Sequence, residues 1–89
     1  MTPEDELAQF TLGQALFEEG SYGEAAQHLA KALELNPEWM MAAILLGKSY
    51  LELGRTAEAK AAFEKALHLA RVQHHADPAE EIQNMLKEL

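Results

Sequence analysis

The chain has 89 residues, of which 48% are hydrophobic and 25% charged, and its formal net charge is −8 at pH 7. This length and composition predict one soluble globular domain with a modest core. The absence of cysteine excludes disulfide frameworks, thiolate zinc sites and thiol nucleophiles. The first six residues hold three acids, unlike the basic start of a signal peptide. The longest apolar run, Trp39 to Leu46, is eight residues, whereas a membrane span needs about 20. We therefore expect a cytoplasmic protein that does not enter a membrane.

The negative charge is concentrated in the N-terminal half. Residues 1–38 contain eight acids and one base, whereas residues 39–75 contain three acids and five bases. Phosphate backbones repel an acidic surface, so we do not expect nucleic acid as a partner. The asymmetry either maintains solubility or favours a basic partner at the N-terminal half.

The first predicted helix starts with Thr2 as a candidate cap and Pro3 in the first turn, and it ends near Glu19. Gly20 is a candidate left-handed stop. A second helix follows and ends near Leu35; Ser21 and Glu24 have the spacing of a capping box at its start.

The third predicted helix opens at Asn36-Pro37 and runs to about Leu53, with a stop at Gly54. A fourth helix starts near Thr56. The last segment predicts a fifth helix with Asp77 as its cap and Pro78 in its first turn. The apolar face of this helix is formed by Ile82, Met85, Leu86 and Leu89.

Residues 6–37 align with residues 40–71 at an offset of 34, with eleven identities in 32 pairs. Such a period predicts stacked helical hairpins. Gly13 and Gly47 fall at the same register, although glycine costs about 1 kcal/mol relative to alanine inside a helix. We expect them to let the helices of each hairpin approach closely, opposite Ala25 and Ala59.

Residues at fixed positions of both copies resemble the tetratricopeptide repeat, a helix-turn-helix unit of 34 residues. The first copy carries Leu12, Gly13, Leu16, Ala25, Leu29, Ala32 and Pro37, and the second carries Leu46, Gly47, Tyr50, Ala59, Phe63 and Ala66. Arg71 replaces the closing proline of the second copy, so we expect its last helix to continue to His74 or His75. The resemblance implies an all-α superhelix in one domain, residues 1–89. It consists of repeats at about 4–37 and 38–71 and a capping helix at about 78–88.

In tetratricopeptide repeats, the first helix of each pair lines a concave groove that holds peptides or helices. Each first helix here has two apolar arcs on a helical wheel. We expect one arc, Ala8, Leu12, Ala15 and Leu16 in the first copy, to pack against the hairpin partner. The resemblance assigns the second arc and its polar neighbours to the groove, with burial in the core as the alternative. These residues are Phe10, Gln14, Phe17, Met41, Ile44, Lys48 and Leu51.

The aromatic residues Phe10 and Phe17 stand where carboxylate-clamping members of the family have polar groups. An apolar peptide or an amphipathic helix is therefore the expected ligand, supplied by a protein partner. The alternative is a homodimer that buries the same apolar face.

Enzyme signatures are missing: there is no phosphate-binding loop, no Gly-x-Ser-x-Gly and no His-Glu-x-x-His. We therefore expect no catalysis and no cofactor. A metal site shared by His68, His75 and Asp77 is the weaker hypothesis, and histidines at the surface are favoured. We expect no metal.

Overall fold

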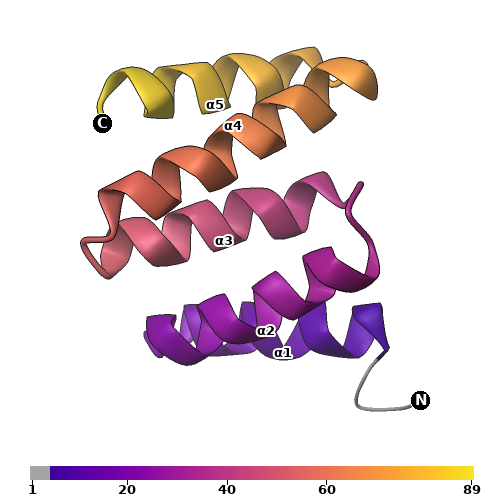
Figure 1. The fold of residues 1–89 in the computed structure, drawn as a ribbon, viewed down its shortest axis with the longest axis vertical. Helices are drawn as coiled ribbons and strands as arrows, with labels where there is room; N and C mark the ends of the chain where they lie inside the picture. Colours follow the sequence, from indigo (N-terminus) through magenta and orange to yellow (C-terminus); the bar gives the residue numbers. More distant parts are fainter. Residues whose placement is uncertain (1–4) are drawn as a thin grey trace.

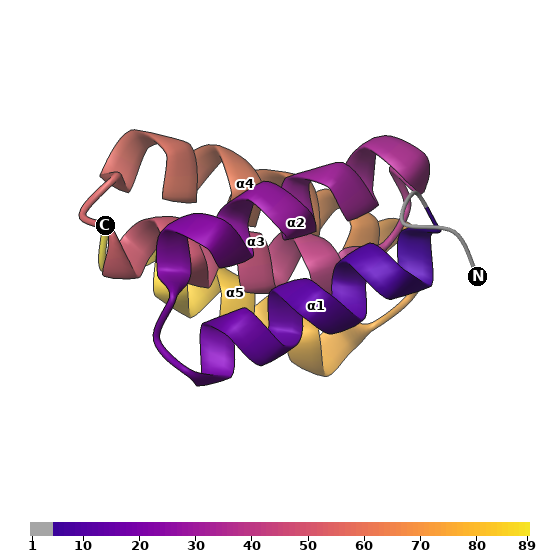
Figure 2. The same cartoon turned by 90° about the horizontal axis from the view of Figure 1, so that it is seen from below.

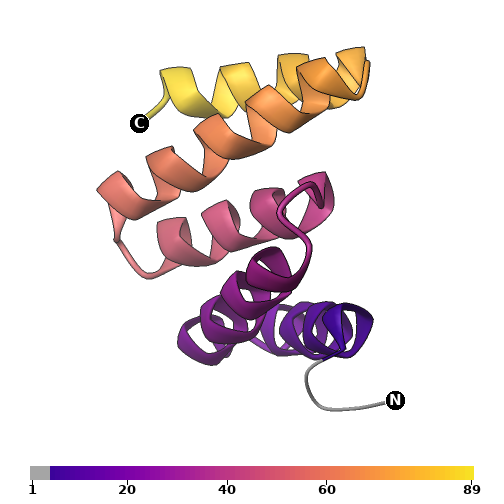
Figure 3. The ribbon, with the colours of Figure 1, turned by 45° about the vertical axis from the view of Figure 1, so that its right-hand side comes forward.

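The computed structural model describes residues 5–89, which form five α-helices and no strand over that range. The helices are α1 (Glu6–Glu18), α2 (Tyr22–Leu35), α3 (Met40–Glu52), α4 (Thr56–Val72) and α5 (Ala76–Lys87). They are stacked in chain order, with α1 at one end of the molecule and α5 at the other (Figures 1 and 3). The predicted all-α fold of two helical hairpins and a fifth helix is confirmed.

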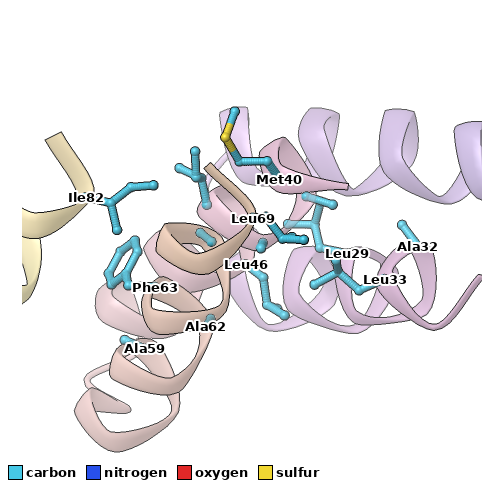
Figure 4. Packing of buried hydrophobic residues seen from close by; sticks show 14 of the residues in the cluster. Leu29, Ala32, Leu33, Met40, Leu46, Ala59, Ala62, Phe63, Leu69 and Ile82 are labelled. Atoms are coloured by element: carbon cyan, nitrogen blue, oxygen red, sulfur yellow. The ribbon is translucent and has the colours of Figure 1, made fainter. Parts of the chain in front are cut away.

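The hairpins form two layers. α1 packs against α2 and α3 packs against α4, while α2 also contacts α3 and α4 contacts α5. Seen from the α1 end, α2 and α4 lie along one side of the stack and α1 and α5 along the other (Figure 2). α5 covers the second hairpin as predicted, with Ile82 only 1% exposed and lying beside Phe63 (Figure 4). The first helix of each hairpin and α5 therefore belong to the same layer.

The two helices of each hairpin are in close contact at a buried glycine. A Cβ atom at Gly13 would lie 2.7 Å from Cγ of Leu29, and a Cβ atom at Gly47 would lie 2.7 Å from Cε1 of Phe63. Both partner side chains are fully buried. Each glycine thus allows a large side chain of the second helix to pack directly on the backbone of the first.

The predicted neighbours of these glycines, Ala25 and Ala59, are buried at 0% exposure, but they are not the closest atoms. The closest side chains belong to Leu29 and Phe63, one helical turn later in each second helix. The expectation of a close approach was correct, and the nearest contacts are made by the larger side chains of Leu29 and Phe63.

Helices α1 and α3 end at left-handed glycines, as predicted. The φ angles are +88° at Gly20 and +76° at Gly54, a region that costs other residues free energy. The N–H of the residue after each glycine donates to a carbonyl five positions earlier, at 2.8 Å and 2.9 Å respectively. This Schellman arrangement satisfies carbonyl groups that the helix leaves without partners.

α4 ends in the same way without a glycine. His74 adopts φ 60°, and the N–H of His75 donates to the carbonyl of Ala70 at 2.7 Å. The prediction that this helix continues to His74 or His75 was therefore wrong, because α4 ends at Val72.

Two predicted caps differ from the structure. Ser21 precedes α2 as expected, but its hydroxyl donates to Oε1 of Glu19 at 3.1 Å and makes no capping hydrogen bond, so no capping box with Glu24 forms. α5 begins at Ala76 after His75, so Asp77 lies in its first turn and does not cap it. The carboxylate there still lies near the positive end of the helix dipole.

The start of α3 was also predicted too early. Oδ1 of Asn36 accepts a hydrogen bond from the N–H of Glu38 at 3.3 Å, which forms a turn instead of a helix. The helix begins at Met40 after Trp39. At the N-terminus, the predicted roles of Thr2 and Pro3 fall outside the described residues.

α1 begins at Glu6, and its cap is Asp5. The Oδ1 atom of Asp5 accepts a hydrogen bond from the N–H of Leu7 at 2.8 Å. This bond satisfies one of the donors that a helix start leaves free.

We predict that His74→Gly stabilises the protein by about 0.5–1 kcal/mol, because glycine adopts the left-handed conformation without the Cβ clash of histidine. Gly54→Ala, which places a Cβ at the equivalent position after α3, should destabilise it by a similar amount. Chemical denaturation of both variants and the parent protein measures the two free energies. A loss of stability in His74→Gly would contradict the proposed strain.

We further predict that Gly47→Ala destabilises the protein by about 1–3 kcal/mol, because the added methyl group collides with the ring of Phe63. Gly23→Ala is the matched control. A Cβ at Gly23 would have no neighbour within 4 Å, so alanine there should be neutral or stabilising. Equal effects of the two substitutions in thermal unfolding would show that the close contact at Gly47 does not hold the hairpin together.

Candidate protein-binding groove

A hollow of about 200 Å³ lies between α3 and α5. Three of the predicted site residues, Met41, Ile44 and Lys48, line it from α3. The facing wall was not predicted from the sequence, because α5 was expected to act only as a cap. That wall consists of Pro78, Glu81, Ile82 and Met85.

The α3 wall of the hollow is mainly apolar. Met41 is 50% exposed, whereas Ile44 is 8% exposed and belongs to the core, so only its edge reaches the hollow. Leu51, one turn after Lys48, is 40% exposed at the surface of α3 but does not line the hollow. The helix therefore offers a deep apolar contact at its centre and accessible apolar side chains on both sides of it.

Two charged groups border the hollow. Lys48 is half-buried on α3, and Glu81 is exposed on α5. Over residues 5–89 the only ion pair joins Arg55 and Glu58, at 3.8 Å, so neither Lys48 nor Glu81 has a charged partner. The ammonium and carboxylate groups are available to orient a ligand lying between the two helices.

A second and larger hollow, of about 530 Å³, lies at the N-terminal ends of α1 and α3. Leu7 and Trp39 contribute apolar surface to it, and Met41 borders both hollows. Its edge is held by a hydrogen bond of 2.7 Å from Nε2 of Gln73 to the carbonyl oxygen of Glu38. Met41 thus lines both depressions.

The predicted site residues of α1 do not line the hollow between α3 and α5. Phe10 is half-buried and stacks on Trp39, with ring centroids 4.4 Å apart. Phe17 is also half-buried and meets Tyr22 edge to face at 5.2 Å, while Gln14 is exposed. Both aromatic rings therefore join the hydrophobic packing and keep part of their surface accessible.

One predicted packing face is only partly correct, since Leu16 packs against the core and Ala8 is half-buried. The arc of α1 that includes Leu12 and Ala15 was expected to pack against α2, but Leu12 is 46% exposed and Ala15 is exposed as well. The equivalent residue Leu46 of α3 is only 7% exposed, because α2 of the preceding hairpin packs against α3. In the described part of the chain no helix occupies that position beside α1.

Within residues 5–89, no three histidine, aspartate or glutamate side chains are grouped so that they could hold a metal ion. None of the helices in this range is both long enough and apolar enough to span a membrane.

The fold is similar to two solved structures of a tetratricopeptide repeat domain protein from Salinibacter ruber. The solution NMR structure superimposes with a TM-score of 0.84 and 23% sequence identity, covering 99% of this chain and 89% of the other. The crystal structure gives a TM-score of 0.82 and 21% identity, covering 94% and 93% of the two chains. At this identity the likeness establishes the fold, and it confirms the resemblance to the tetratricopeptide repeat.

No curated protein sequence matches the chain. A family model does match, and its match extends over residues 4–89, nearly the whole chain. That model is described as regulator of microtubule dynamics protein 1-3, and the chain belongs to this family.

Proposed function

We propose that the chain is a non-catalytic protein-interaction module, and that α1, α3 and α5 hold an apolar peptide or an amphipathic helix of a partner protein. The observation that carries the proposal is the pair of hollows that are both lined by Met41 and bordered by apolar side chains. Grooves of this kind accept helices that present an apolar face at i, i+3, i+4 and i+7.

The polar groups support the same ligand class. A few unpaired polar groups in an otherwise apolar site fix the orientation of a ligand. Lys48 and Glu81 stand in this position on opposite walls of the smaller hollow. An amphipathic segment with one carboxylate near Lys48 and one cation near Glu81 would satisfy both groups.

The expected affinity is modest. Burial of four apolar side chains contributes about 1.5–3 kcal/mol each. Association costs about 4–15 kcal/mol in lost freedom of motion. Only the favourable ends of these ranges, about 12 against about 4 kcal/mol, leave the roughly 8 kcal/mol of micromolar binding. The groove alone therefore gives micromolar affinity at best, and tighter binding requires a partner that covers additional surface.

The family description supports a regulatory role. Its members are described as regulators of microtubule dynamics. A domain that binds a protein segment without catalysis suits such regulation, by recruiting or positioning another protein in that process.

The proposal predicts that Met41→Glu removes partner binding, because the carboxylate introduces charge at a residue that lines both hollows. Val72→Glu is the matched control, since Val72 is 59% exposed on α4 and lines neither hollow. Proteins captured from cell extract by each variant and by the parent chain can be compared by quantitative mass spectrometry. We expect specific partners to be lost only with Met41→Glu.

Identical sets of captured proteins from the two variants would contradict the groove proposal. Light scattering over a range of concentrations tests the alternative occupant, a second copy of the chain. A dimer that Met41→Glu converts to a monomer would show self-association through this face and would replace the proposed partner.

A further inference from the structure

The two hairpins share their sequence pattern but not their exposure. Leu12 is 46% exposed, whereas its equivalent Leu46 is 7% exposed. Leu35 is 42% exposed, whereas its equivalent Leu69 is 7% exposed. The surface that is covered in the second hairpin is thus open in the first. We call this surface the N-terminal face; its residues are Leu12, Ala15 and Leu35, which are exposed, and Ala8, which is half-buried.

The structure shows what covers the same face in the second hairpin. α2 packs against α3, and Leu46 and Leu69 point toward Leu29 and Leu33 of α2 (Figure 4). Leu33 is 9% exposed, and Ala26, seven residues earlier on the same stripe, is 5% exposed. A helix with a small residue and a leucine at this spacing therefore matches the shape of the N-terminal face.

The opposite end of the stack does not match it. The apolar side of α5 is already covered, because Ile82 is buried against the second hairpin. Leu46 of α3 is buried against the first hairpin in the same way. The exposed side of α5 carries polar groups, namely Glu80, Gln83, Asn84 and Lys87. A second copy docking head to tail would therefore bring a polar helix onto an apolar face.

Charge also disfavours a second copy and indicates the partner. In residues 5–35 there are six acids and one base, Lys31, whereas residues 40–72 hold three acids and five bases. Asp5 and Glu19 lie seven residues on either side of Leu12, so both carboxylates flank the N-terminal face along its own helical stripe. A symmetric dimer through this face would place like charges together, which is unfavourable.

We propose that the N-terminal face docks an amphipathic helix of a different protein, one whose apolar stripe resembles that of α2 and whose polar flanks are basic. The docked helix would occupy, beside α1, the position that α2 occupies beside α3. This surface lies at the end of the stack and is distinct from the groove.

The test uses three synthetic peptides based on residues 21–36, which contain α2. The basic peptide carries Glu24→Lys, Gln27→Lys and Glu34→Lys, and the acidic peptide carries Gln27→Glu and Lys31→Glu. Both keep the apolar stripe. A scrambled form of the basic peptide has the same charge but no stripe, and it controls for non-specific attraction to an acidic protein.

Each peptide is titrated into the ¹⁵N-labelled full chain and followed by NMR. We expect the basic peptide to shift the amide signals of Ala8, Leu12, Ala15 and Leu35. It should bind at least about tenfold more tightly than the acidic and scrambled peptides at low salt, and this advantage should shrink as salt is added. Leu12→Glu should weaken binding by at least about tenfold.

Leu51→Glu is the matched control, because Leu51 has a similar exposure of 40% but lies on α3 at the groove side. Retained binding by Leu51→Glu and loss by Leu12→Glu support the N-terminal face. Three results would overturn the proposal. They are amide shifts concentrated at Met41 and Lys48, equal binding of all three peptides, and no binding of the basic peptide. Sedimentation showing a dimer that Leu12→Glu dissociates would identify a second copy as the occupant and also contradict the proposal.

Discussion

The fold depends on one contact that occurs twice: a glycine of a first helix receives a large side chain of the second helix on its backbone. At Gly13 the side chain is Leu29, and at Gly47 it is Phe63. The missing Cβ sets the spacing of the two helices in each hairpin, and it places the remaining apolar residues of α2 toward α3. α2 packs against α1 on one face and against α3 on another. Burial of this second apolar face holds the two hairpins together in the stack.

The same stacking explains why equivalent residues of the two hairpins differ in solvent exposure. α3 is covered by its hairpin partner α4 and by α2 of the preceding hairpin. α5 packs against the preceding helix α4, whereas α1 packs against α2 and has no preceding helix within residues 5–89. The layer of first helices therefore carries the proposed groove, and the end at α1 carries the additional apolar face. Both surfaces consist of apolar side chains that no neighbouring helix of the stack covers.

Much of this arrangement could be predicted from the sequence, because it depends on local periodicity. The offset of 34 residues identified both hairpins, and Gly20 and Gly54 correctly marked two helix ends. The errors occurred where a single hydrogen bond or backbone angle determines where a helix begins or ends. The Asn36 side chain forms a turn before α3, so the helix starts later than predicted, and the left-handed conformation of His74 ends α4. The wall contributed by α5 was missed because the apolar stripe of α5 was assigned to capping the second hairpin. A helical wheel does not show that Pro78, Glu81 and Met85 face α3. The burial of Ile44 depends on tertiary packing, which a helical wheel does not contain.

The unequal exposure of equivalent leucines is the feature from which the binding surfaces follow, and solvent paramagnetic relaxation of methyl-labelled protein measures it directly. A soluble paramagnetic agent should strongly enhance the relaxation of the Leu12 and Leu35 methyl groups and leave those of Leu46 and Leu69 protected. Equal protection of Leu12 and Leu46 would show that the first hairpin is covered in solution, and would contradict an open N-terminal end.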